Sequence, residues 1–240
     1  MSLVTVLAVA GFAAAVGGLV QSGVGLGVGL VTAPVLTLLD PALMPGAMLV
    51  TGTCLPLLIL AREIRHADWR GASWALAGRL AGTAAGVWVV AAVPLRVLGL
   101  CIGAAVLAVV MVTSLGASLP RNGATLLAAG TVSGVSGTAT SIGGPPVALL
   151  YQRESGPRLR ATLSVFLFTG NLLALVALGV SGHLPGRDIP AGLVLLACAG
   201  AGFAAAARLR GYLDGGRIRT AVLLVTSASA LALIVRSLVG

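Results

Sequence analysis

The sequence has few charged residues and no lysine. Charged side chains make up 9% of its 240 residues, hydrophobic side chains make up 58%, and the mean hydropathy is +1.08. Soluble domains carry roughly 25% charged residues, so this composition excludes an ordinary soluble protein. Apolar stretches long enough to cross about 30 Å of hydrocarbon recur along the chain. We therefore predict an all-α polytopic membrane protein with a single integral domain, residues 1–240.

Residues that build catalytic, redox or metal sites are also scarce. Cys54, Cys101 and Cys198 are isolated within apolar stretches, a spacing that supports neither a disulfide framework nor a zinc site. The two histidines, His66 and His183, fall in separate predicted connections. We therefore expect no enzyme activity, no cofactor and no metal. The formal net charge of +9 comes from arginines, nearly all in short connections, which indicates orientation signals and not a nucleic-acid partner.

Continuous apolar segments predict six plain membrane crossings, and two further regions are interrupted by glycine and hydroxyl residues. The predicted crossings are residues 46–60, 72–92, 95–117, 161–180, 190–207 and 218–238. The interrupted regions are 3–39 and 122–151. Each is either a hairpin that returns to its starting side or a crossing with a broken centre.

The placement of arginine favours hairpins. If both interrupted regions return, eleven arginines share one side of the membrane and three face the other, and by the positive-inside rule the first side is cytoplasmic. The first group is Arg62, Arg65, Arg70, Arg121, Arg153, Arg158, Arg160, Arg208, Arg210, Arg217 and Arg219, and the second is Arg96, Arg187 and Arg236. Position 186 is then expected to face outward and position 158 the cytoplasm.

Correspondences between the two halves predict an internal repeat. Gly18, Gly25, Pro34 and Val35 match residues 130, 137, 146 and 147 at a constant offset of 112, and Thr51-Gly52 matches Thr169-Gly170. Each half, about 1–117 and 122–240, is then a broken helix or re-entrant hairpin followed by three transmembrane helices. Three is an odd number of crossings, so the second hairpin starts on the opposite side and the halves are inverted repeats.

The two interrupted stretches form the candidate substrate site. Backbone that leaves helical geometry at membrane depth is tolerated where protein covers it or a watery cavity faces it. Two breaks that enter from opposite sides are expected to meet near the midplane, where helix N-termini and hydroxyl groups can bind a small anion. The predicted substrate-binding residues are Gln21, Ser22, Gly23, Gly25, Thr32, Pro34, Thr51, Thr53, Ser133, Gly137, Thr138, Thr140, Ser141, Gly143, Gly144, Pro145, Thr169 and Asn171.

Arg79 is the one charged residue well inside a predicted span, and two interpretations of it are open. Its long stem could carry the charge to the cytoplasmic surface, or the guanidinium could attract the anion. On the same span Gly78, Gly82 and Gly86 are interpreted as packing positions. A valine at Gly143 is therefore expected to abolish transport, with Gly82→Val as the control. All six carboxylates fall in predicted connections, so no proton coupling through a carboxylate is expected.

The segments "GVGLGVGLVTAPVL", "SGTATSIGGPPVALLY" and "RATLSVFLFTGNLL" resemble the duplicated signature of the TauE/SafE family, the sulfite exporters or TSUP transporters. The resemblance implies a permease of the bacterial inner membrane for sulfite, thiosulfate or organosulfonates such as sulfoacetate. Val24, Leu26 and Val28 depart from the glycine run that is usual in the family. We therefore expect a secondary transporter or exporter whose partners are the lipid bilayer and a small sulfur-containing anion, with a homodimer as one candidate assembly.

Two other functions fit part of the pattern. Gly134-Val135-Ser136-Gly137 fits the G-x-S-G pattern of rhomboid-like intramembrane proteases, but such a serine needs a nearby base, and both histidines lie in loops predicted on opposite sides. An anion channel is the closer alternative, because polar backbone can line a pore as well as a closed site. Inverted repeats favour alternating access, and therefore a carrier.

Overall fold

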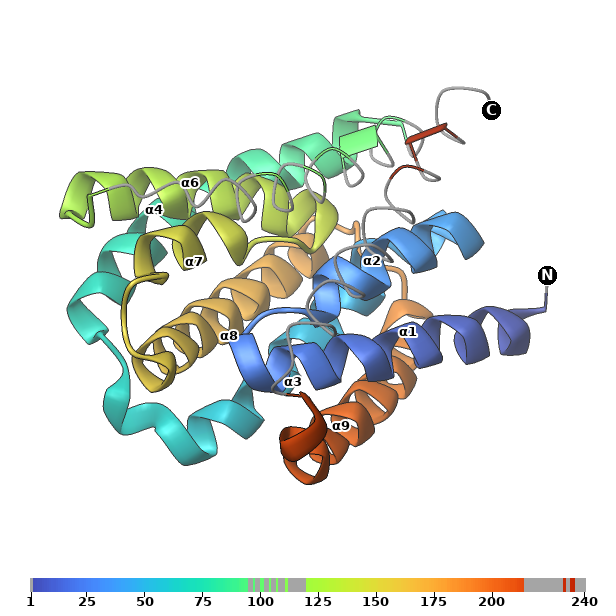
Figure 1. Ribbon diagram of the computed structural model, residues 1–240. Coiled ribbons are helices and arrows are strands. Elements are labelled where there is room, and N and C mark those ends of the chain that lie inside the picture. The colour runs from blue at the N-terminus through green and yellow to red at the C-terminus, as the bar shows by residue number, and fades with distance from the viewer. Residues whose placement is uncertain are drawn as a thin grey trace.

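A computed structural model describes residues 2–94 and 120–213, together with isolated positions between 97 and 111 and between 231 and 235. Over this part of the chain the regular structure is entirely helical (Figure 1). Its elements are α1 (Leu3–Val24), α2 (Val28–Leu39), η1 (Pro41–Leu43), α3 (Gly46–Glu63), η2 (Ile64–His66), α4 (Trp69–Ala92), α6 (Gly123–Thr140), α7 (Pro145–Tyr151), α8 (Gly156–Val180) and α9 (Asp188–Leu213). The predicted all-α fold is confirmed.

Five segments of the described chain are long and apolar enough to cross a membrane. They are Leu3–Gly23, Gly46–His66, Trp69–Ala92, Gly156–Val180 and Asp188–Ala206. The last four correspond to predicted crossings, whereas the crossings predicted at 95–117 and 218–238 lie, apart from isolated positions, outside the described residues. The first differs from the prediction, because α1 alone has the length of a full crossing and the break follows it.

Glycine, proline and side-chain caps set the positions of the two breaks. α1 ends at Gly25, which has a left-handed conformation with φ of 85° that costs glycine little. α2 then starts at Val28, whose N–H donates to Gln21 Oε1 at 3.2 Å. α6 ends at Ser141, also left-handed with φ of 60°, and α7 begins at Pro145, whose fixed φ suits a first helical turn.

Each pair of broken helices returns to the end of the molecule where it began (Figure 1). Leu3 of α1 and Asp40 after α2 border one pocket beside Arg187. Arg121 before α6 forms an ion pair with Glu154 after α7, with Nη2 and Oε1 2.8 Å apart. The second interrupted region is therefore a hairpin, as the arginine placement predicted, and the two hairpins open at opposite ends of the molecule.

Closely packed helix pairs flank a centre formed by α3 and α8. α4 lies along α6, and α1 lies along α9 (Figure 1). A Cβ atom added at Gly78 would overlap the Leu127 carbonyl, and one added at Gly82 would overlap the Thr131 carbonyl. Glycine therefore lets the α4 and α6 backbones approach closely, which confirms the packing interpretation of these positions.

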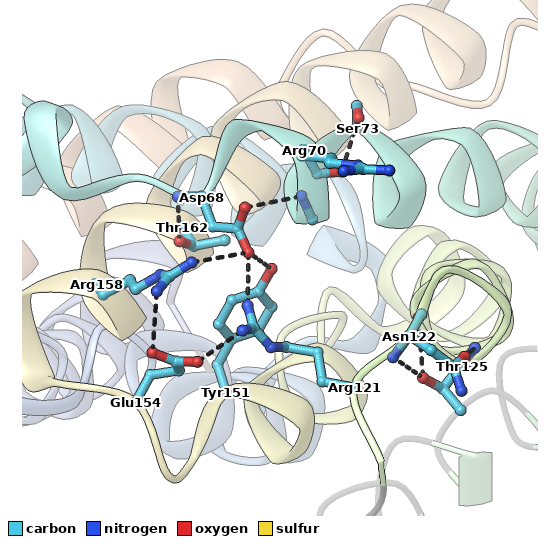
Figure 2. A network of polar contacts seen from close by, with 11 residues as sticks. Asp68, Arg70, Ser73, Arg121, Asn122, Thr125, Tyr151, Glu154, Arg158 and Thr162 are labelled. Atoms are coloured by element: carbon cyan, nitrogen blue, oxygen red, sulfur yellow. Dashed lines mark hydrogen bonds and ion pairs between the residues drawn. The ribbon is translucent and has the colours of Figure 1, made fainter.

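An ion-pair network joins the helices at the end of the molecule that carries Arg121 and Arg158, here called the arginine-rich end (Figure 2). Asp68, the N-cap of α4, accepts hydrogen bonds from Arg121 Nη1 at 2.6 Å and the Tyr151 hydroxyl at 2.9 Å. Arg158 of α8 lies 3.6 Å from the same Asp68 oxygen and 3.4 Å from Glu154. The network therefore ties the start of α4 to α6, α7 and α8.

Burial by itself raises the pKa of Asp68. Hydrogen bonds from the Gly71 N–H and the Tyr151 hydroxyl, with the positive charges of Arg121 and Arg158, outweigh burial and hold that pKa below its usual value. Asp68 is therefore ionised at neutral pH, and its charge is balanced by both arginines.

The expectation that every carboxylate lies in a connection is wrong for two residues. Glu63 belongs to the last turn of α3, where its carboxylate binds the Arg160 guanidinium through two hydrogen bonds, 3.0 Å and 2.5 Å. Asp188 begins α9 and is only 1% exposed, with Oδ1 buried and unpaired. We predicted Asp188 in the preceding loop because the predicted apolar span begins only at residue 190.

Candidate functional site

The two breaks meet at a small cavity between α3 and α8. A Cβ atom at Gly29, in the first turn of α2, would lie 3.0 Å from the Ser141 carbonyl oxygen, so the two interrupted segments touch. The cavity has a volume of about 40 Å³, space for a solute of a few heavy atoms. It is lined by Gln21, Leu26, Gly27, Val28, Gly29, Leu30, Met48, Gly52, Ser141, Ile142, Gly143, Gly144, Pro145, Leu167 and Asn171.

Arg79 lies directly behind one wall of this cavity and is 0% exposed. It is ten residues from the start of α4, or about 15 Å along the helix axis, which is close to half the thickness of a bilayer core. Its side chain extends toward α8, where Nη2 donates to Asn171 Oδ1 at 2.7 Å. The snorkelling interpretation is therefore wrong: the charge is held at mid-depth by contacts with α8.

The Arg79 guanidinium has hydrogen-bonding capacity left over. Its carbon lies 4.9 Å from the centroid of the Phe166 ring, which makes a cation–π contact. Nε and Nη1 are buried and have no hydrogen-bond partner. In the part of the chain that the structure describes, no carboxylate pairs with this guanidinium. The site therefore contains a buried positive charge with two unused nitrogen donors.

Three glycines provide the space that the guanidinium occupies. A Cβ atom would lie 2.9 Å from Arg79 Nη2 at Gly137 and 2.5 Å from Nη1 at Gly143, and at Gly170 it would overlap Nε. Side chains at these positions are excluded by the arginine itself. Gly137 and Gly143 were predicted to lie against the substrate; the structure places both against Arg79, and Gly143 also lines the cavity.

Buried hydroxyl groups occur on the broken helices α2 and α6 and on α4. Ser133 and Thr138 of α6 and Thr32 of α2 are fully buried, and their hydroxyl oxygens have no hydrogen-bond partner. Thr83, one turn after Arg79 on α4, has the same character and was not predicted. Thr140 instead donates to the Ser136 carbonyl and accepts from the Ile142 N–H, so its hydroxyl shapes the break.

One third of the predicted residues line the cavity itself. These are Gln21, Ser141, Gly143, Gly144, Pro145 and Asn171. Ser141 also donates to the Pro45 carbonyl at 3.0 Å, which connects the second break to the start of α3. The predicted meeting of the two interrupted segments is thus present, with α3 and α8 completing the walls.

The remaining predicted residues are not brought to the cavity lining. Gly23 and Gly25 lie against Arg160, with the Gly23 carbonyl 3.4 Å from Arg160 Nη1. Ser22 bonds within α1, and Pro34 is buried inside α2. Thr51 donates to the Ala47 and Gly192 carbonyls, Thr53 donates to Leu49, and Thr169 is exposed.

Glycines beside the predicted threonines face the centre. A Cβ atom at Gly52 would lie 2.8 Å from Asn171 Nδ2, and Gly170 contacts Arg79 as described above. The repeated Thr-Gly pair in the sequence pointed to both positions, but we assigned the threonine of each pair to the site and not the glycine. Phe166 and Met48 were also missed, since nothing in an apolar span distinguishes an aromatic or methionine that faces a site from one that faces lipid.

The expectation that helix N-termini supply the positive end of the site needs correction. α7 has only seven residues and begins with Pro145 and Pro146, which have no N–H group to donate. The Val28 N–H at the start of α2 is occupied by Gln21. The full charge of Arg79 is therefore the main positive element, with the first turn of α2 facing the same cavity.

The family model described as "Sulfite exporter TauE/SafE" matches residues 9–233, nearly the whole chain. No curated protein and no solved structure matches the chain.

Proposed function

Because the chain belongs to the TauE/SafE sulfite exporter family, we propose that it is a secondary transporter or exporter of small sulfur-containing anions such as sulfite, thiosulfate or organosulfonates. Members of this family are transporters and not enzymes. The described helices make the chain a multi-pass membrane protein, and the bacterial inner membrane is its proposed location. The family covers sulfite and anion export in general, so the choice of substrate has to come from the site.

The observation that carries the proposal is the unpaired guanidinium of Arg79. A buried ion without a counter-charge is costly, and ionisable residues at membrane depth usually mark substrate or ion pathways. Here the free nitrogen Nη1 lies beside Gly143, which lines the cavity where the two breaks meet, whereas Nε lies beside Gly170. An anion in that cavity would supply the counter-charge and an acceptor for Nη1.

Matching contacts support an inverted-repeat arrangement of the two halves. In four places a glycine packs against a backbone carbonyl of a neighbouring helix, and these four contacts form two equivalent pairs. Within each pair, the α1 residue corresponds to an α6 residue 112 positions later, and the α4 residue corresponds to an α9 residue 124 positions later. The pairs are Gly18–Ala199 with Gly130–Ala75, and Gly202–Ala15 with Gly78–Leu127. Repeats that oppose each other around a central site are typical of alternating-access carriers, which favours a carrier over a channel.

The intramembrane protease alternative has no support at Ser136. The Ser136 hydroxyl donates to the Val132 carbonyl at 2.9 Å, a bond within its own helix. His66 lies in η2 at the arginine-rich end, and His183 contacts Ser181 after α8 at the other end. Neither histidine is in a position to activate this serine.

Counterflow of radiolabelled sulfite in proteoliposomes tests the proposal. Vesicles loaded with unlabelled sulfite are expected to accumulate the label transiently, which a carrier does and a pore does not. Arg79→Gln is expected to reduce the initial rate at least tenfold, because removing one partner of a buried charged contact costs several kcal/mol. Arg70→Gln, on the exposed start of the same helix, is the matched control. Equal rates in wild type and Arg79→Gln would contradict the assignment.

A further inference from the structure

Arg79 is the only charged residue at the centre of the described chain. The other polar groups there, the amides of Gln21 and Asn171 and the buried hydroxyls, are neutral. Charged side chains of α4 and α8 other than Arg79, namely Arg70, Arg158 and Arg160, lie at the arginine-rich end, and α6 has none. No described histidine, cysteine, tyrosine or carboxylate lines the cavity. Among the residues that the structure describes, the centre therefore carries one full positive charge.

The described part of the second half, residues 120–213, supplies no matching cation at the centre. The contacts that relate Ala75 to Ala199 and Gly78 to Gly202 place α9 at an offset of 124 residues from α4. The same offset relates Arg79 to Phe203, which is buried in the apolar core between α1 and α9. The described helices α4 and α9 therefore make matching packing contacts but differ in charge.

From this asymmetry, and resting on the proposed function, we propose that the site accepts its oxyanion only in a monovalent form. One guanidinium balances one negative charge, and the pair is then close to neutral in a region of low dielectric. A divalent anion would leave a whole uncompensated charge buried near the middle of the membrane, which is strongly unfavourable. The dipole of α2 adds only a partial positive charge to this balance.

The free donors fit a small oxyanion. Nη1 of Arg79 is the nitrogen nearest the position of a Gly143 Cβ atom, at 2.5 Å, and Nε is equally without a partner. Nη2 stays on Asn171, which fixes the plane of the guanidinium and leaves Nη1, beside the cavity-lining Gly143, for a ligand oxygen. Hydrogensulfite and small monovalent sulfonates meet the charge and size requirements. Sulfate, thiosulfate and fully ionised sulfite do not meet the charge requirement, so this inference narrows the substrates proposed above and removes thiosulfate from them.

Flux in proteoliposomes of the full chain at pH 6 and pH 8 tests the proposal, because sulfite changes from mainly hydrogensulfite to mainly the dianion between these values. Leakage is subtracted with protein-free vesicles. At fixed total sulfite, we expect the initial rate to fall in proportion to the hydrogensulfite concentration, by roughly five- to tenfold. Unlabelled methanesulfonate, monovalent at both pH values, is expected to compete equally at both. Sulfate and thiosulfate, divalent throughout, are expected to compete at least tenfold less well than methanesulfonate.

The outcomes distinguish a failure of the monovalent rule from a failure of the proposed transport function. Competition by sulfate or thiosulfate equal to that of methanesulfonate would overturn the monovalent rule while leaving the protein an anion transporter. A methanesulfonate effect that falls with pH in step with the sulfite rate would also overturn it, since the protein and not the substrate would then be titrating. Failure of the reconstituted protein to move sulfite at either pH would overturn the proposed function and this inference with it.

Discussion

At the scale of single residues, the centre of the protein is an arginine enclosed by glycines. Gly137, Gly143 and Gly170 leave the space that the Arg79 guanidinium fills, and Asn171 holds one of its nitrogens. Any side chain at these positions would displace the cation before it reached a ligand. The glycines are thus explained by the arginine, and the proposed anion would supply the counter-charge that the arginine lacks among the described residues.

Gly143→Ala is predicted to reduce sulfite transport at least tenfold. The added methyl group would lie 2.5 Å from Arg79 Nη1 and 2.9 Å from the Ser133 carbonyl oxygen, so the guanidinium has to move from its place beside the cavity. Initial rates in proteoliposomes measure the effect. Gly200→Ala is the matched control, since a Cβ atom there meets nothing within 4 Å. Transport by Gly143→Ala at the wild-type rate would show that the guanidinium position is unimportant.

Gly82→Val, the control expected from the sequence, is unsuitable. A side chain at Gly82 would overlap the Thr131 carbonyl of α6, so the variant separates two packed helices. Overpacking of this kind typically costs about 1–3 kcal/mol. The loss of transport in this variant would report on folding as much as on the site.

The sequence predicted Gly143, Gly144 and Asn171 of the site, did not predict Gly52 and Gly170, and left two interpretations of Arg79 open. Breaks in apolar periodicity are visible in a sequence, because glycine and proline interrupt it. The direction of a long side chain is not, because it depends on which neighbouring helix covers it. The predicted start of the helix at residue 72, three residues later than observed, also made Arg79 look closer to the surface than it is.

At the scale of helices and connections, the network around Asp68 closes the arginine-rich end (Figure 2). It joins the start of α4, in the first half of the chain, to α6, α7 and α8 in the second. The ion pair between Glu63 and Arg160 makes a second connection between the halves.

Asp68→Asn is predicted to lower the free energy of unfolding by about 1–2 kcal/mol at neutral pH, because asparagine keeps the cap of α4 but loses the ion pairs. The pKa of Asp68 is lowered in the folded protein, so its contribution is present above the ordinary aspartate value of about 3.9 and is lost as the pH falls through the lowered value. Denaturation in detergent at several pH values measures this difference.

The difference between wild type and Asp68→Asn is therefore expected to vanish in strong acid. Asp40→Asn is the control, since Asp40 caps η1 through the Ala42 N–H and forms no ion pair with a described residue. A difference for Asp68→Asn that does not change with pH would show that the charge of Asp68 contributes nothing.

The helices with continuous apolar sequence were predicted well, and the interrupted ones less well. α3, α4, α8 and α9 follow from hydrophobic runs of bilayer length. The length of α1 could not be predicted in this way, because its helix continues through Gly17, Gly18 and Gly23 before it ends. Glycine lowers helix propensity in general, but close packing of Gly18 on α9 compensates for it here.

At the scale of the whole molecule, the arginine-rich end is predicted to face the cytoplasm. Arg62, Arg65, Arg121, Arg158 and Arg160 lie at this end, which the positive-inside rule assigns to the cytoplasm. In a chain without its native cysteines, Gly186→Cys is expected to react with an impermeant thiol reagent from outside the cell, and Arg65→Cys only after permeabilisation. Both positions are exposed, so accessibility reports the side of the membrane. The reverse labelling pattern would invert the orientation.

The central claim is that the buried cation of Arg79 binds an anion. Thermal unfolding of the purified protein with and without methanesulfonate tests it most directly. Wild type is expected to gain about 2.7 kcal/mol of stability at an anion concentration one hundred times the dissociation constant. Arg79→Met is expected to be at least as stable as wild type without the anion, because the unpaired charge is gone, and to gain nothing when the anion is added. Equal stabilisation of wild type and Arg79→Met by methanesulfonate would contradict the account.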